Sequence, residues 1–142
     1  MKLSKLYGTE ISSEDKKRRG YILGVSCVGE RIDGFFCCDN SDKEFFAKAE
    51  NFKLKGESVT FVSTGKPAEN SHSLKLGRAV FTENGGLVGL LDDCVFEGEI
   101  IKTACIGKKK YDFSHLTIGD IIIIKGVEIA AKDMFINAIC GG

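Results

Sequence analysis

The chain of 142 residues has little proline and no net charge. The first shortage argues against a disordered chain, and the second argues against a polyanionic partner. A single proline, Pro67, beside 17 glycines argues against a proline-rich disordered chain and suits many tight turns. Basic and acidic residues both number 20, so the formal net charge is zero. The broad attraction that drives most nucleic-acid binding is therefore missing, and a polyanion is not the expected partner.

Long apolar runs are also missing. No stretch has the length of a transmembrane helix, and residues 1–6 lack the apolar centre of a signal peptide. We therefore expect a cytoplasmic protein that does not insert into a membrane. In such a reducing compartment, the six cysteines are expected to be free thiols rather than disulfides.

One pattern of glycines and strand-like segments occurs twice. The matching pairs are residues 6–11 with 75–80, residues 32–38 with 100–106, and residues 56–61 with 119–124. They keep their order, and their offsets of 69, 68 and 63 drift in one direction, as small differences in loop length require. A spacing this long indicates a duplicated domain rather than a solenoid. Because a half-length chain buries only about 60% of its extended surface, the two copies are expected to pack together.

The seam between the copies lies in the polar segment Ser63–His72, which holds the only proline. We predict a first repeat over residues 1–66, a linker over 67–72, and a second repeat with a C-terminal extension over 73–142. After residue 126 the apolar residues recur at helical spacing, which predicts a short C-terminal helix that packs on the rest. Those apolar residues are Val127, Ala131, Met134, Phe135, Ala138 and Ile139.

Short segments rich in Ile, Val and Phe, separated by turn residues, predict ten strands. They are Thr9–Ser12, Tyr21–Val28, Ile32–Cys38, Glu44–Lys48 and Ser58–Val62 in the first copy. In the second copy they are Arg78–Phe81, Leu87–Phe96, Ile100–Ile106, Lys110–Phe113 and Asp120–Ile124. Many short connected strands suggest small, nearly closed barrels, which remove sheet edges.

Two expectations concern which side chains are buried. Strand alternation places Ile32, Phe36 and Cys38 on one face, and it does the same for their counterparts Ile100, Ala104 and Ile106. The run Ile121–Ile124 is apolar throughout, so we expect it to be covered on both faces, where the two copies meet.

The second copy resembles the PRC-barrel family. The resemblance rests on Gly77–Phe81, Gly85–Gly89 and Asp92–Phe96, then on the segment Tyr111–Leu116 and the apolar strand Ile121–Ile124. In the first copy, Lys16–Arg19 stands where the glycine-rich turn would be, and the match is weaker. The resemblance implies an all-β fold of two tandem small β-barrels. It also implies docking onto other proteins rather than catalysis.

The cysteines do not have the spacing of zinc ligands, because no C-x-x-C occurs. Cys37 and Cys38 are neighbours on one predicted strand and point to opposite faces. A free cysteine in a strand is commonly a small buried apolar residue. We expect core packing for those in predicted strands, which are Cys27, Cys37, Cys94 and Cys105. Cys140, beside the terminal glycines, is the thiol expected to be exposed, and it leaves a thiol switch open.

The aspartates, histidines and glycines that could form a catalytic or binding site also have structural interpretations. Asp92 and Asp93 are consecutive on a strand and do not converge, so a turn cap or a lysine partner is expected. His72 lies in the linker and His115 in a polar turn, which favours surface positions for both. The glycines Gly85, Gly86 and Gly89 are not followed by a helix start or by Gly-Lys-Ser/Thr, so a phosphate-binding loop is not supported.

The basic clusters Lys16–Arg19 and Lys108–Lys110 fall in turns, where solvated charge is the ordinary interpretation. We therefore assign no catalytic, cofactor-binding or metal-binding residue and do not expect an enzyme. The expected function is a protein-binding adaptor or regulatory module, with self-association left open. Two alternatives stay open: an RNA-processing or ribosome-associated factor that uses the basic turns, and a thiol or metal sensor.

Overall fold

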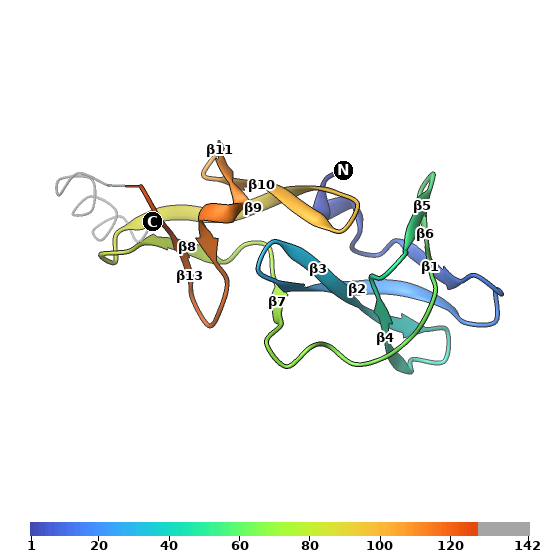
Figure 1. Ribbon diagram of the computed structural model, residues 1–142. Helices are drawn as coiled ribbons and strands as arrows, with labels where there is room; N and C mark the ends of the chain where they lie inside the picture. The colour runs from blue at the N-terminus through green and yellow to red at the C-terminus, as the bar shows by residue number, and fades with distance from the viewer. Residues whose placement is uncertain (128–142) are drawn as a thin grey trace.

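The structure of the chain is a computed structural model that describes residues 1–127 (Figure 1). It is all-β, as predicted, because the only helical segments in this range are the 3-10 turns η1 (Leu3–Lys5) and η2 (Phe113–His115). The strands of the first half are β1 (Glu10–Ser13), β2 (Arg19–Val28), β3 (Arg31–Asp39), β4 (Glu44–Lys48), β5 (Lys53–Lys55) and β6 (Ser58–Phe61). Those that follow are β7 (His72–Leu74), β8 (Ala79–Thr82), β9 (Leu87–Glu97), β10 (Ile100–Ile106), β11 (Lys109–Asp112), β12 (Leu116–Thr117) and β13 (Ile122–Ile124).

All ten strands predicted from the sequence are present, two of them, Glu44–Lys48 and Ile100–Ile106, with the predicted bounds. The three strands that were not predicted, β5, β7 and β12, are two or three residues long and carry polar residues. The predicted C-terminal helix lies outside the described residues, apart from Val127.

The strands form one hydrogen-bonded network in the order β12-β13-β8-β9-β10-β3-β2-β1-β6-β5. The remaining strands join this path from the side, β4 on β3, β7 on β2 and β11 on β10. After β6 the chain also returns to β4, where Thr64 bridges Ala47 and the Gly65 N–H donates to the Phe46 carbonyl at 3.0 Å. Figure 1 shows an elongated molecule, with β1–β6 in one half and β8–β13 in the other.

The strand pairing of the first half recurs in the second half. Ile11 pairs with Gly20, and their counterparts Val80 and Gly89 pair in the second half. Hairpin β2–β3 has bulges at Leu23 and Asp33, and hairpin β9–β10 has them at the equivalent positions, Asp92 and Lys102. Parallel pairing of β1 with β6 likewise recurs between β8 and β13. The two halves therefore share one strand plan, down to the position of each bulge.

These bulges correct two details of the sequence analysis. The offset of 68 between residues 32–38 and 100–106 is wrong by one, because the bulges align Ile32 with Ile101. The expected faces are wrong in part, for the same reason. A bulge changes the side-chain alternation, so Ile32 shares the core with Phe35 and Cys37, while Phe36 is only half-buried. In β10 Ala104 and Ile106 are both buried, as their shared face predicts, but the third buried residue is Ile101 rather than Ile100.

The expectation for the isoleucine run is also wrong. Ile121 is 56% exposed, whereas Ile122 and Ile124 are fully buried. The strand therefore alternates between core and solvent instead of being covered on both faces. It pairs with β12 and β8, at the end of the strand order that lies away from the first half.

The two halves meet through the hairpin ends. The Ile32 N–H donates to the Glu99 carbonyl and the Ile101 N–H donates to the Glu30 carbonyl, both at 2.7 Å. Beside them, the Arg31 guanidinium forms an ion pair with the Glu99 carboxylate at 3.3 Å.

Each half also contributes a segment to the other half. At the start of the chain, the Met1 ammonium donates to the Phe96 carbonyl, and the Phe96 N–H donates to the Met1 carbonyl, both at 2.9 Å. In the opposite direction, β7 leaves the predicted linker at His72 and pairs with β2 of the first half. The halves are therefore interlocked by two exchanged segments.

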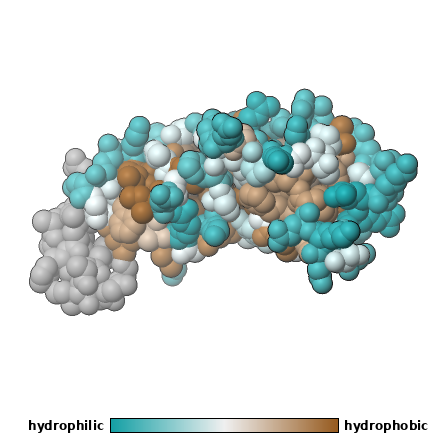
Figure 2. Space-filling view, turned by 90° about the horizontal axis from the view of Figure 1, so that it is seen from below, coloured by the Kyte–Doolittle hydropathy of each residue, from teal (hydrophilic) through white to brown (hydrophobic). Residues whose placement is uncertain are grey.

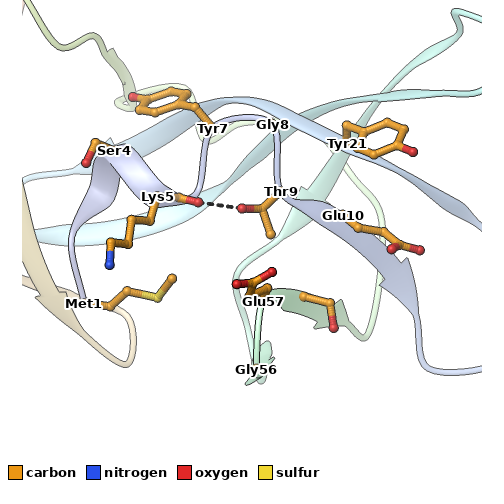
Figure 3. Close-up of a pocket in the computed structure, with 11 residues that line it drawn as sticks. Met1, Ser4, Lys5, Tyr7, Gly8, Thr9, Glu10, Tyr21, Gly56 and Glu57 are labelled. Atoms are coloured by element: carbon orange, nitrogen blue, oxygen red, sulfur yellow. Dashed lines mark hydrogen bonds between the residues drawn. The ribbon is translucent and has the colours of Figure 1, made fainter.

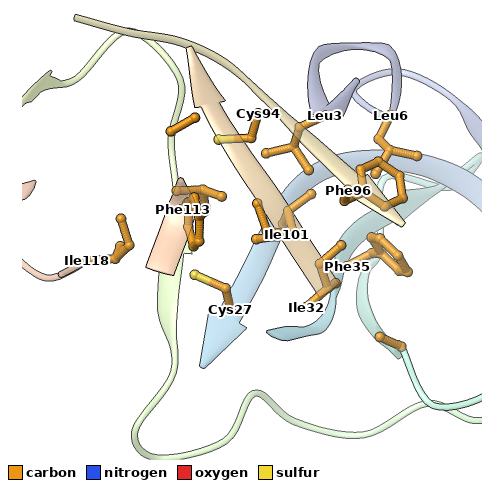
Figure 4. Packing of buried hydrophobic residues seen from close by; sticks show 14 of the residues in the cluster. Leu3, Leu6, Cys27, Ile32, Phe35, Cys94, Phe96, Ile101, Phe113 and Ile118 are labelled. Atoms are coloured by element: carbon orange, nitrogen blue, oxygen red, sulfur yellow. The ribbon is translucent and has the colours of Figure 1, made fainter. Parts of the chain in front are cut away.

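A single hydrophobic core runs through both halves (Figure 4). Leu3 and Leu6, from the exchanged N-terminal segment, are fully buried near Cys94 and Phe96 of β9. The core continues through Ile32 and Ile101, the pair that the repeat aligns, so the centre of the molecule is built from both halves.

Candidate functional site

A groove of about 960 Å³ lies in the first half, beside the N-terminal segment (Figure 3). Residues that line this N-terminal groove include Met1, Lys5, Thr9, Glu10, Tyr21 and Glu57. They come from η1 and the residues on either side of it, from β1 and β2, and from the turn between β5 and β6.

The local backbone opens the groove. Gly8 follows η1 with a φ of 80°, a left-handed conformation that glycine adopts readily, and its N–H donates to the Ile22 carbonyl at 2.7 Å. Opposite it, Gly56 starts the β5–β6 turn with a φ of 57°. The Thr9 hydroxyl donates to the Lys5 carbonyl at 2.5 Å, so this side chain is turned back along its own segment (Figure 3).

One wall of the groove is fixed from the second half. The Asp93 carboxylate of β9 accepts hydrogen bonds from the Ser4 N–H at 2.9 Å and from the Ser4 hydroxyl at 2.5 Å. Because backbone N–H groups at the start of a helical turn have no partner within it, this carboxylate caps η1. The predicted role of Asp93 as a structural acid therefore has a specific form here, which is to hold the segment that carries Ser4 and Lys5.

Charged and aromatic groups of the groove face solvent. Tyr21 is 49% exposed and Met1 is 39% exposed. Within residues 1–127 the one ion pair is Arg31 with Glu99, so Lys5, Glu10 and Glu57 all lack an ionic partner there. Figure 3 shows the Glu57 side chain directed toward Thr9, with Lys5 on the side of Met1. The groove thus offers a carboxylate, an ammonium and an aromatic ring to a ligand.

Apolar side chains also lie on the outer face of the first half. There the half-buried Phe36 packs edge to face on the buried Phe46, with ring centroids 5.3 Å apart, over the glycines of β2 and β3. Leu23, at the bulge of β2, is 57% exposed. Figure 2 shows hydrophobic surface over the half that contains β2 to β4. Exposed apolar surface of this kind is typical of contact sites.

The cysteines divide into two groups. Cys27, Cys37 and Cys94 are at most 1% exposed, which confirms core packing for these three. Burial raises the pKa of Cys27 to about 11 and those of Cys37 and Cys94 to about 12, so these thiols keep their protons at neutral pH. Cys38 and Cys105 are half-buried, and all five are free thiols. Cys140 lies outside the described residues.

The remaining candidates are distributed over the surface. Asp92 accepts a hydrogen bond from the Lys108 N–H at 3.4 Å, in the turn between β10 and β11, while Asp93 caps η1. His72 begins β7 and His115 ends η2, and both are exposed. No three metal-binding side chains gather within residues 1–127, and no helix there is long and apolar enough to cross a membrane.

The basic clusters and the glycine-rich turn join strands. In the β1–β2 turn, Lys16 has a φ of 63° and the Arg18 guanidinium lies 5.0 Å from the centroid of the Phe45 ring. Lys108, with a φ of 71°, is in the β10–β11 turn. Gly86 donates its N–H to the Thr82 hydroxyl at 2.9 Å, and β9 follows directly, so these glycines connect two strands.

No protein-family model matches the chain, and no curated protein matches it. The PRC-barrel resemblance therefore remains a prediction from the sequence.

The groove has no signature in the sequence. Its residues Thr9, Tyr21 and Glu57 have no motif spacing, because the groove is formed by segments that come together only in the fold. The available signal was the repeat itself, which aligns Thr9 with Arg78 and so points to a difference between the halves.

Proposed function

We propose that this protein is a non-catalytic adaptor or regulatory module of the PRC-barrel type, in which two tandem repeats form one interlocked body that binds a protein partner. The shared strand plan of the two halves and the exchange of segments between them support the architecture. The N-terminal groove is proposed as the main contact site for the partner.

The observation that carries this proposal is the exposure of Tyr21 in the groove, 49% open to solvent beside unpaired charges. Tyrosine and methionine are enriched in protein interfaces, where an aromatic anchor surrounded by polar groups supplies much of the binding free energy. Leu23, also on β2 and 57% exposed, extends the apolar surface that a protein partner could cover.

The repeat offers a matched control for Tyr21. Leu90 occupies the equivalent position of β9 and is 50% exposed. It does not line the N-terminal groove. Replacing either residue by serine removes a similar exposed side chain, but only one of the two changes alters the groove.

The experiment is capture of a partner on the immobilised full-length protein, followed by calorimetry with the purified partner. We expect Tyr21→Ser to weaken binding at least tenfold and Leu90→Ser to leave it unchanged. Circular dichroism confirms that both variants keep the fold. Equal binding by all three proteins would place the contact elsewhere, and the absence of any saturable protein partner would refute the adaptor function.

Of the alternative functions, the thiol sensor draws no support from the three buried cysteines. An RNA factor would depend on the basic turns Lys16–Arg19 and Lys108–Lys110, whose residues are all exposed. The same capture experiment addresses it, because ribonuclease treatment would then release the bound material.

A further inference from the structure

An arginine in the second half bridges two strand ends. Arg78, just before β8, donates from its guanidinium Nη2 to the Gly119 carbonyl at 2.8 Å and to the Asp120 carbonyl. Both acceptors lie between β12 and β13. The side chain is half-buried, and its guanidinium ties this turn to the start of β8.

The equivalent position in the first half is Thr9. The Leu91 N–H donates to the Arg78 carbonyl at 2.8 Å, and in the first half the Ile22 N–H donates to the Thr9 carbonyl at 3.0 Å. The parallel pairings of β1 with β6 and of β8 with β13 align the turn at Gly56 and Glu57 with Gly119 and Asp120. The same two strand ends therefore face each other in both halves.

Only the second half fills this space with its own side chain. Thr9 is short, and its hydroxyl is bonded to Lys5 rather than to the β5–β6 turn. The space between Thr9 and that turn is part of the N-terminal groove, and Gly56 and Glu57 line it (Figure 3). The first half thus has the same pair of strand ends without the arginine, with a two-residue turn at Gly56 and Glu57 in place of the longer loop over residues 118–121.

We propose that the N-terminal groove binds a guanidinium group, supplied by an arginine side chain of a ligand in the place that Arg78 occupies in the second half. This rests on the proposed function, since it names the chemistry by which the partner is recognised. The Glu57 carboxylate, which is directed toward Thr9, accepts from the planar guanidinium, and Tyr21 is the aromatic residue of β2 that lines the same groove.

The charges around the groove favour a bound cation on one of its two sides. Glu57 and Glu10 attract a cation at the β1 and β5–β6 side of the groove (Figure 3). The two cations of the groove, Lys5 and the Met1 ammonium, lie at its other side, and the Met1 ammonium is bonded to the Phe96 carbonyl. Arginine is preferred over lysine because its donors form a rigid fork that satisfies several acceptors at once.

The test is a titration of the full-length protein, followed by the amide signals of Thr9 and Glu57 in nitrogen–proton NMR spectra. The probe is N-acetyl-L-arginine amide, which presents the side chain as a peptide does. We expect saturable binding of one equivalent with a dissociation constant on the order of 1 mM, since one small group in an open groove binds weakly. The lysine amide should bind at least tenfold more weakly.

Two substitutions use the repeat as an internal control. Thr9→Arg gives the first half its own arginine and should weaken probe binding at least tenfold. Arg78→Thr opens the second site and should raise the number of bound probes from one to two. Glu57→Gln keeps the shape of the groove and should weaken binding about tenfold, which keeps the test decisive even if Arg78→Thr fails to fold.

The remaining outcomes are also informative. Equal binding of the lysine and arginine amides, unchanged binding by Thr9→Arg, or no saturation at tens of millimolar would each overturn the proposal. Free L-arginine in place of the amide distinguishes the source: preference for the free amino acid would identify a small molecule, and preference for the amide a peptide. A protein partner that depends on Tyr21 but not on Thr9 would overturn arginine recognition alone and leave the adaptor function standing.

Discussion

Substitution of Leu3 by alanine should destabilise the whole protein, although Leu3 lies near the start of the chain. Its side chain is fully buried against the second half, next to Cys94 and Phe96. The change removes three carbon groups, worth about 0.8 kcal/mol each on transfer from water, or about 2.4 kcal/mol. The unfilled cavity adds to this, so we expect a loss of about 3 kcal/mol in the free energy of unfolding.

The assay is equilibrium unfolding in urea, followed by far-ultraviolet circular dichroism and by tyrosine fluorescence. We expect one transition that both signals share, because the exchanged segments and the common core couple the two halves. A loss of about 3 kcal/mol should also lower the midpoint of thermal unfolding by roughly 10 °C for a chain of this size. Lys5→Ala is the matched control, since Lys5 belongs to the same 3-10 turn but is exposed, and its effect should stay within about 0.5 kcal/mol.

Either of two results would refute this reasoning. If Leu3→Ala costs less than about 1 kcal/mol, the N-terminal segment is not part of the core. If the two signals separate into two transitions, the halves unfold independently and the interlock does not couple them.

Four further predictions concern packing and protonation. Gly20→Ala should lower the free energy of unfolding by about 3 kcal/mol, because the added Cβ would lie 2.3 Å from the Cys38 carbonyl oxygen. Gly24→Ala is the control: its added Cβ has its nearest contact at 3.5 Å, so thermal melts should show a cost of less than about 1 kcal/mol. After alkylation with iodoacetamide at pH 8, mass spectrometry should find Cys27, Cys37 and Cys94 unmodified until the protein unfolds. The reason is that burial raises their pKa values to about 11, 12 and 12. Rapid labelling of any of them in the folded protein would contradict the structure. The folded state holds these thiol protons more tightly than the unfolded state does. The free energy of unfolding should therefore be constant below the ordinary thiol pKa of 9.0 and should fall as the pH rises from there toward 12. Urea titrations at several pH values measure this, and a stability that rises over that range would contradict it. Glu99→Gln should change stability by less than about 1 kcal/mol, and in 1 M salt by nothing measurable, because the Arg31 side chain of this ion pair is 65% exposed.

Strand positions could be predicted from the sequence because each strand is a short apolar run between turn residues. Gly29 and Gly98 show why the turns were also visible, since both have a φ near 57° at the start of a two-residue hairpin turn, where glycine is favoured. The short strands β5, β7 and β12 could not be predicted. Their residues have no apolar alternation, and they are strands only because a neighbouring strand offers hydrogen bonds.

Neither the bulges nor the groove could be predicted from the sequence, for different reasons. Asp33 and Lys102 look like ordinary members of their strands, and only the pairing register shows that each is left without a partner opposite. The groove depends on the difference in length between Thr9 and Arg78 and on a turn that is distant in the sequence. The sequence aligns the two residues, but it does not show that the Arg78 guanidinium reaches across to Gly119.

The exchange of segments between the halves has a consequence for how the chain folds during synthesis. Met1 and Phe96 are hydrogen-bonded across a separation of 95 residues, and the binding site for Leu3 and Leu6 includes β9. Until β9 has left the ribosome, these two leucines have no place to be buried. The first half therefore emerges with two apolar side chains exposed to solvent. Contacts that close such long loops form slowly. Commitment to the native state therefore waits for the second half, and a chain interrupted before β9 would be a target for chaperones and proteases rather than a stable fragment.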